Sequence, residues 1–169
     1  VAILLSVLMG FTAIVIDVGI SYNNKTNLQS AADAVSLAVS TQGAATEGYN
    51  PVKNATQNIA LRKSVYDYFK LNNIDSFEFD ENDPNSSNIE VWSLARKEYA
   101  IETAKENPDR DVALIFYNST DEYQYIEVYA HTHTNAMFGK IFDFEAYNLT
   151  VSSAAKCQIL FGGNPEALS

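Results

Sequence analysis

The 169-residue sequence has few of the residues that mark disulfide-rich domains and nucleic-acid-binding proteins. Its single cysteine, Cys157, excludes a disulfide within the chain and is expected to be a small buried side chain. There are 11 basic residues against 21 acidic ones, the formal net charge is −10, and no Lys/Arg-rich run occurs. Because such a surface repels polyanions, nucleic acid is not expected as a partner.

Catalytic and ligand-binding motifs are also missing. The sequence has no glycine-rich phosphate loop, no Ser-His-Asp pattern in a nucleophile-elbow context and no Cys-His nucleophile context. Its two histidines, His131 and His133, could share a strand face with Glu127, but this spacing matches no known metal signature. We therefore expect no enzymatic activity, no cofactor, no metal and no small-molecule substrate.

The most informative feature is a long segment without charge at the start of the sequence. Residues 1–16 contain no charged side chain, and Asp17 is the first. A helix of about 20 residues spans ~30 Å, the thickness of the hydrocarbon core of a bilayer. Apolar residues then recur at helical spacing as far as Val39. We predict one helix from about Ile3 to Ser40, apolar all round at first and then amphipathic, ending near Gly43.

The apolar half of this helix is not expected to be stable in water. Burying its large apolar side chains contributes on the order of 15–30 kcal/mol, more than the whole stability of a typical domain, about 5–15 kcal/mol. Lipid, detergent or packed copies of the same helix must therefore cover it. The alternative, a central helix buried in a soluble domain, is disfavoured by its position at the start of the sequence.

Two motifs follow one another in this region. Residues 9–19 read Met-Gly-Phe-Thr-Ala-Ile-Val-Ile-Asp-Val-Gly, and residues 27–34 read Asn-Leu-Gln-Ser-Ala-Ala-Asp-Ala. In order and spacing they resemble the TadE/TadG-like pilins and minor pilins of tight-adherence systems, which are related to type IV pili. Ile16 replaces a valine of the first motif, Val35 replaces an alanine of the second, and Leu5 stands where type IV pilins generally carry glutamate.

The resemblance implies a pilin or pilin-like subunit of an extracellular filament at the cell surface, with a role in adhesion or surface structure. Its partners would be copies of itself in the filament, the membrane before assembly, and the pilus assembly machinery. An alternative stays open: a single-pass, membrane-anchored extracytoplasmic binding or accessory protein that does not polymerise.

Filament-core contacts are expected from the first helix, at Ile3, Leu4, Val7, Leu8, Gly10, Phe11, Ile14, Val15 and Asp17. The small residues Ala2, Ser6, Gly10 and Ala13 line one face, where they would permit close approach of another helix. Asp17 has three candidate roles: it marks the bilayer edge, it makes a polar helix-packing contact, or it pairs with the N-terminal amine of a neighbouring subunit. The first role is preferred.

The rest of the sequence predicts an α+β head with a small, mainly antiparallel sheet, pilin-like in class. Helices are expected over residues 50–71 and 93–107, strands over 77–79, 89–92, 112–117, 123–132 and 147–156, and a short apolar link over 137–142. Residues 1–20 are thus predicted to be a membrane or filament-core helix. Residues 21–169 are predicted to form the extracytoplasmic head, which includes the amphipathic half of the helix.

One predicted strand has two chemically different faces. Ile126, Val128 and Ala130 alternate as a core face, whereas Tyr123, Tyr125 and Tyr129 alternate with them on the other face. The tyrosine face is either exposed to solvent or forms a subunit interface. Separately, Asn85 and Asn118 lie in Asn-x-Ser/Thr sequences in predicted loops and are the best candidates for glycosylation.

Overall fold

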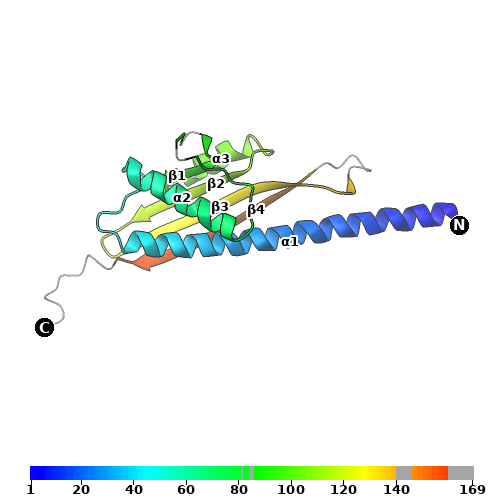
Figure 1. Ribbon diagram of the computed structural model, residues 1–169, viewed down its shortest axis with the longest axis horizontal. Coiled ribbons are helices and arrows are strands. Elements are labelled where there is room, and N and C mark those ends of the chain that lie inside the picture. Colours follow the sequence, from blue (N-terminus) through cyan, green and yellow to red (C-terminus); the bar gives the residue numbers. More distant parts are fainter. Residues whose placement is uncertain (81, 84–85, 140–145, 160–169) are drawn as a thin grey trace.

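The computed structural model describes residues 1–80, 82–83, 86–139 and 146–159 and shows a long helix lying along a sheet (Figure 1). In chain order its elements are α1 (Ala2–Ala44), α2 (Ala55–Leu71), β1 (Ile89–Ser93), the 3-10 helix η2 (Leu94–Arg96), α3 (Lys97–Lys105), β2 (Val112–Ser119), β3 (Tyr123–Asn135) and β4 (Ala146–Gln158). The expected α+β class, a long N-terminal helix packed on a small and mainly antiparallel sheet, is confirmed.

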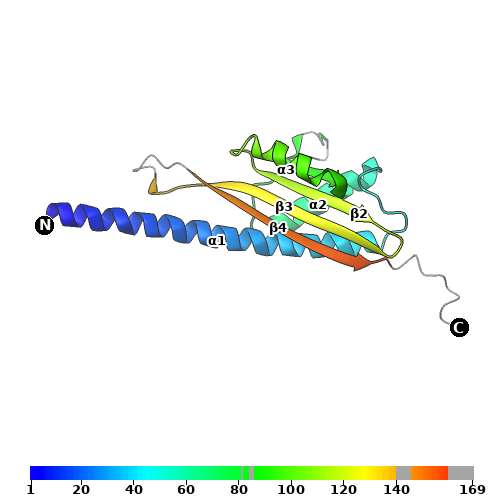
Figure 2. The ribbon, with the colours of Figure 1, turned by 180° about the vertical axis from the view of Figure 1, so that it is seen from behind.

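The four strands form one sheet in the order β1-β2-β3-β4. β1 runs parallel to β2, whereas β3 is antiparallel to both β2 and β4. Helices α1 and α2 pack on one face of the sheet, and α3 packs on the other (Figures 1 and 2). The central strand β2 is therefore covered on both faces, which explains why its residues 112–117 are all buried.

The second half of α1 packs on the sheet through the second sequence motif. Ala31 and Ala32 are completely buried, and Leu28 and Val35 continue the contact along the same side of the helix. Small side chains at these positions let the helix approach the sheet closely, at the packing density of a protein interior. The residues that resemble the pilin motif thus hold the helix on the sheet.

Polar side chains complete the contact between α1 and β4. Ser36 Oγ lies 3.0 Å from Ser153 Oγ, and Ser40 Oγ lies 3.4 Å from the Sγ of Cys157. Because each of these small groups has a partner, the helix covers β4 without leaving them unsatisfied. Cys157 is half-buried in this contact.

Each face of the sheet carries its own hydrophobic core. The larger core lies under α1 and α2 and contains Phe69 and Phe77, whose ring centroids are 4.4 Å apart. The smaller core lies under α3 and contains Ala100, Phe116 and Tyr129. The head therefore has three layers over β1 and β2, but only two over β4.

The first helix ends near Gly43, as predicted, since its last residue is Ala44. Gly43 also has a packing role that the sequence did not predict. A Cβ atom on Gly43 would lie 2.4 Å from Gln124 Oε1 and 2.8 Å from the ring of Tyr49. Gln124 Nε2 also donates to the Gly43 carbonyl at 3.0 Å. The glycine thus leaves room for the side chains of Gln124 and Tyr49 to pack against the end of α1.

The start of α2 differs from the prediction for a local reason. The helix begins at Ala55 rather than at Asn50, because Asn54 is the N-cap and its Oδ1 accepts the Gln57 N–H at 3.1 Å. Asn50 closes a separate turn, in which its Oδ1 accepts the Lys53 N–H at 3.2 Å.

The strand predicted over residues 77–79 is not formed. Phe77 is buried, but the neighbouring backbone pairs with a side chain instead of with a strand. Asn88 Oδ1 accepts the Glu78 N–H at 2.7 Å, and Asn88 Nδ2 donates to the Ser76 carbonyl at 3.0 Å. One amide group thus satisfies backbone groups that a neighbouring strand would otherwise satisfy.

The helix predicted over residues 93–107 is shorter than expected. Ser93 still belongs to β1, η2 takes up the next turn, and only α3 is α-helical. At the start of α3, Lys97 Nζ lies 2.7 Å from Glu127 Oε1 on β3. This ion pair, with the carboxylate nearly buried, fixes the short helix on the sheet.

We predict that Phe69→Ala destabilises the head by about 3–5 kcal/mol, because it leaves a cavity against Phe77 in the larger core. The measurement is denaturant unfolding of the full chain in detergent, followed by near-ultraviolet circular dichroism. Leu71→Ala is the matched control, since Leu71 lies on the same helix but is 76% exposed, and a change within about 0.5 kcal/mol is expected. Equal losses in both variants would contradict the described core.

Candidate assembly surface

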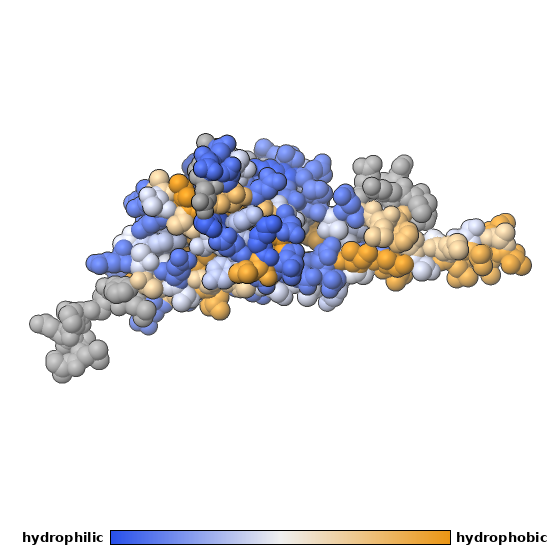
Figure 3. Space-filling model, in the orientation of Figure 1, coloured by the Kyte–Doolittle hydropathy of each residue, from blue (hydrophilic) through white to orange (hydrophobic). Residues whose placement is uncertain are grey.

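The first half of α1 projects beyond the head as a bare apolar helix (Figure 3). The large apolar residues predicted to form the filament core are all between 44 and 83% exposed: Ile3, Leu4, Val7, Leu8, Phe11, Ile14 and Val15. Among the described residues, α1 is the one helix long and apolar enough to span a membrane. This surface has the composition of a protein interior, and among the residues that the structure describes only Ala13 and Asp17 of residues 1–20 are buried.

Asp17 lies where the bare half of α1 meets the head. It is only 2% exposed, although it lies in the apolar part of the helix. The link that follows β3, at residues 137–139, reaches across to this point of the helix and surrounds the carboxylate. The charge is thus buried within the chain.

Three consecutive backbone N–H groups bind the Asp17 carboxylate. Met137 N lies 3.0 Å from Oδ1, Phe138 N lies 3.2 Å from Oδ1 and 2.9 Å from Oδ2, and Gly139 N lies 2.6 Å from Oδ2. Hydrogen bonds to a charged acceptor are shorter and stronger than neutral ones. Together they offset the cost of removing the carboxylate from water and join the link to the helix.

This geometry supports the second of the three candidate roles of Asp17. The residue makes a polar packing contact whose partners belong to the same chain, and its position at the edge of a bilayer stays a prediction. Both carboxylate oxygens already accept hydrogen bonds, which weakens the alternative of an ion pair with a neighbouring amine. The short apolar link was predicted over 137–142, of which residues 140–142 lie outside the described residues.

A groove opens beside this contact. It has a volume of about 810 Å³, and its walls include Leu5, Met9, Gly10 and Ile16 of α1 and Phe138 of the link. Gly10 is half-buried here, whereas the large residues around it are exposed. The apolar surface of the helix is therefore concave where it faces Phe138 of the link. On its other sides it is the convex surface of an exposed helix.

The structure divides the tyrosine face of β3. Tyr129 is only 9% exposed and packs in the smaller core, because α3 covers this part of the sheet. Its prediction as a surface residue is therefore corrected.

The other two tyrosines contact charged side chains. Tyr125 donates to Glu127 Oε2 at 3.0 Å. Burial is the main cause that raises the pKa of Tyr125, and the Glu127 carboxylate raises it further. The ammonium of Lys156 lies 3.5 Å from the ring centroid of Tyr123. Tyr123 and Tyr125 stay partly exposed, and their role at an interface stays a prediction.

The two histidines are held by neighbouring groups. His131 lies 2.8 Å from Thr150 Oγ1 and 2.9 Å from the Pro108 carbonyl, and His133 Nδ1 lies 2.8 Å from Asp111 Oδ1. Within the part of the chain that the structure describes, no group of three His, Cys, Asp or Glu residues is placed to hold a metal ion. These contacts fasten the loop before β2 to the sheet.

The two predicted glycosylation residues differ in what the structure shows. Asn118 is exposed, but it lies in β2 rather than in a loop. Asn85 lies outside the described residues. Modification of either stays a prediction.

We predict that Asp17→Asn loosens the link, because an amide has one acceptor oxygen and would turn its NH2 group toward backbone N–H donors. The expected result is faster amide hydrogen exchange at residues 137–139 and a loss of about 1–3 kcal/mol in stability, measured by exchange mass spectrometry and by unfolding in detergent. Asp33→Asn, on an exposed position of the same helix, is the control and should leave the link unchanged. Unchanged exchange in Asp17→Asn would refute the anchoring role.

Comparison with known families gives one match. Residues 1–46 match the Tad family model, described as Flp pilus-assembly TadE/G-like. Comparisons with curated proteins and with solved structures find no significant match. The matched segment comprises the bare half of α1, Asp17 and the residues that hold the helix on the sheet. Residues 1–46 therefore form a TadE/G-like pilus-assembly segment, as the two sequence motifs indicated, which fits a pilin-like or membrane-anchored, pilus-associated protein.

Proposed function

We propose that this chain is a structural, non-enzymatic subunit of an extracellular filament that polymerises through residues 1–20 and displays its head at the cell surface. The observation that carries the proposal is the apolar half of α1, in which the large side chains predicted to form the filament core are 44–83% exposed. Such a surface must be covered by lipid or protein. In a filament, copies of the same helix would provide the cover.

The continuity of α1 supports this arrangement. One unbroken helix of 43 residues carries both the bare segment and the part buried in the head. At 1.5 Å per residue, the segment before Asp17 extends roughly 22 Å from the head. A stiff rod of this kind holds each head at a fixed distance and orientation from the axis along which the bare segments pack.

The Asp17 contact removes an obstacle to burial of the whole segment. An uncompensated carboxylate would oppose insertion into lipid or into a helix bundle. Here the charge is satisfied by backbone N–H groups of its own chain, so the segment enters an apolar environment with the link attached. No partner cation from another subunit is required.

The second candidate is a single-pass, membrane-anchored accessory protein that does not polymerise. The same segment supports it, because a helix of about 20 residues matches the hydrocarbon thickness of a bilayer. Electron microscopy of material sheared from the cell surface, with antibody against the head, separates the two. Labelled filaments support polymerisation, whereas label confined to membranes supports the accessory protein.

We predict that Gly10→Leu abolishes filaments, because the larger side chain fills the groove beside α1 and blocks close approach of a neighbouring helix. The measurement is the number of filaments in sheared material, counted by electron microscopy. Circular dichroism of the purified variant in detergent should show an unchanged head.

The matched control is Ser30→Leu, which places the same side chain at an exposed position of α1 outside residues 1–20. Filaments are expected to persist in this control. Normal filaments in Gly10→Leu would exclude close packing at this residue, and loss of filaments in both variants would show that the effect is not specific to the apolar segment.

A further inference from the structure

Two segments of the chain run side by side where the bare half of α1 leaves the head. Asn24 Nδ2 of α1 donates to Thr134 Oγ1 of β3 at 3.5 Å, and Asp17 accepts the N–H groups of residues 137–139. Seven residues of helix and three residues of extended chain each cover about 10 Å. The end of β3 and the link therefore follow the helix from the level of Asn24 to the level of Asp17.

Both segments change from polar to apolar at the same level. On β3 the exposed Asn135 is followed by Met137, which is 67% exposed. On α1, in the same direction, the exposed Lys25 is followed by Val18, which is 54% exposed. Tyr22, 75% exposed, lies at the change, and tyrosine is enriched at the surfaces of membranes. Two segments with one common level of change indicate a flat boundary between water and an apolar phase.

This boundary places the link below the surface of a bilayer. Asp17 precedes Tyr22 by five residues, which is about 8 Å along the helix axis. Membrane-surface elements bury their apolar face about 5–10 Å into the boundary between headgroups and acyl chains. Phe138 also shares the groove of about 810 Å³ with Gly10 and Ile16, so its side chain lies on the projecting side of Asp17.

The polar groups at this depth are satisfied within the chain. Irregular backbone is costly in lipid because its N–H groups lack partners there, but the three N–H groups of residues 137–139 are bound by Asp17. On the bare helix, Ser6 and Thr12 donate to helix carbonyls four residues earlier, at 3.0 and 2.9 Å. The link and the helix beside it are therefore compatible with the same apolar environment.

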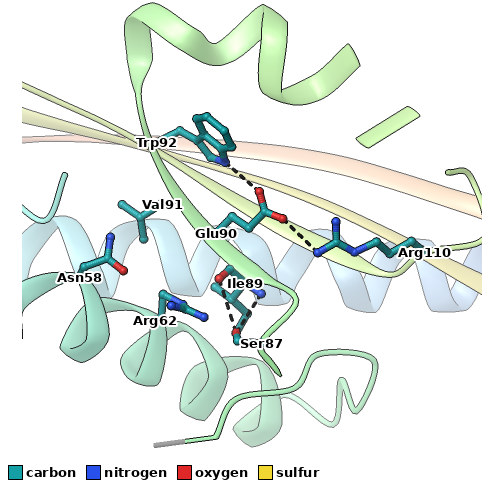
Figure 4. Close-up of a pocket in the computed structure, with 8 residues that line it drawn as sticks. All are labelled: Asn58, Arg62, Ser87, Ile89, Glu90, Val91, Trp92 and Arg110. Carbon is teal, nitrogen blue, oxygen red and sulfur yellow. Dashed lines mark hydrogen bonds and ion pairs between the residues drawn. The ribbon is translucent and has the colours of Figure 1, made fainter. Parts of the chain in front are cut away.

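A second groove of the head has different chemistry. It lies beside β1, the edge strand opposite β4, whose one strand neighbour among the described residues is β2. In this groove the carboxylate of Glu90 accepts hydrogen bonds from Arg110 and from the indole of Trp92, both at 3.0 Å (Figure 4). Paired charges of this kind suit contact with water, unlike the side chains of the link.

We propose that residues 137–139 of the link insert into the membrane leaflet nearest the head and form a second lipid contact beside α1. Met137 and Phe138 contact the acyl chains, and Asp17 satisfies the backbone N–H groups. The contact is apolar, because the formal net charge of −10 disfavours attraction to anionic lipids. The inference rests on the proposed entry of residues 1–20 into the membrane before assembly.

A second contact has a mechanical consequence. The tilt and rotation of a single membrane helix are set by its neighbours and by anchors at the membrane surface. A link that enters the leaflet beside α1 holds the head in one orientation on the bilayer. Each subunit would then be aligned before it joins its neighbours.

The test uses the full chain in phosphatidylcholine nanodiscs that hold one copy each. The half-buried Cys157 is replaced by Cys157→Ser, and an environment-sensitive fluorophore is attached after Met137→Cys, Leu8→Cys or Leu71→Cys, in separate samples. These positions lie in the link, the bare helix and the head, and their side chains are 67, 57 and 76% exposed. Lipids brominated in the upper part of the acyl chains quench a label that contacts them.

The expected result is quenching at positions 8 and 137, with quenching at position 137 at least about fivefold greater than at position 71. Asp17→Asn should reduce quenching at position 137 by at least about twofold and leave position 8 unchanged, because the N–H groups of the link then lose their acceptors. Asp33→Asn, at an exposed position of the same helix, is the matched control and should change neither label.

The possible failures are distinguishable. Quenching at position 8 with no more quenching at position 137 than at position 71 would overturn the lipid contact of the link. Membrane entry of α1 would stand, and the apolar link would be assigned to contact with another copy of the chain. No quenching at position 8 would overturn both. Unchanged quenching at position 137 in Asp17→Asn would exclude the role of Asp17 in insertion.

Discussion

The carboxylate of Asp17 and the three N–H groups that bind it are the interaction on which the arrangement of this protein depends. It joins two segments about 120 positions apart, the apolar helix and the link after β3, at the point where the helix leaves the head. A buried charge without such partners would be driven toward water and would pull the helix out of an apolar environment. With them, one residue fixes the head relative to the projecting segment.

The two halves of α1, before and after the Asp17 contact, are stable in different environments. The second half is stabilised by contacts within the chain, through buried alanines and leucine against β3 and β4. In the first half, only Ala13 and Asp17 are buried among the described residues, so its large apolar side chains need a cover supplied from outside. A protein built in this way is held together as a monomer only at the head, and its projecting segment becomes stable in a membrane or among copies of itself. This division supports the proposed subunit role.

The head contributes a second asymmetry. The edge strand β4 lies under α1, while β1 at the other edge runs along a polar groove with its backbone open. The projecting helix and β1 lie in different layers and at different ends of the sheet order.

The sequence by itself determined the long helix, its change from apolar to amphipathic, the α+β class and the pilin-like segment, because hydrophobic periodicity is a property of neighbouring residues. Only the tertiary structure decided the role of Asp17, the burial of Tyr129 under α3, the function of Gly43 and the open edge at β1. The partners of Asp17 are backbone N–H groups, which every residue except proline carries and which leave no signal in a sequence. Likewise, whether a strand face or edge is covered depends on elements that are distant in the chain. Local sequence patterns do not show such long-range contacts, so only the folded structure shows them.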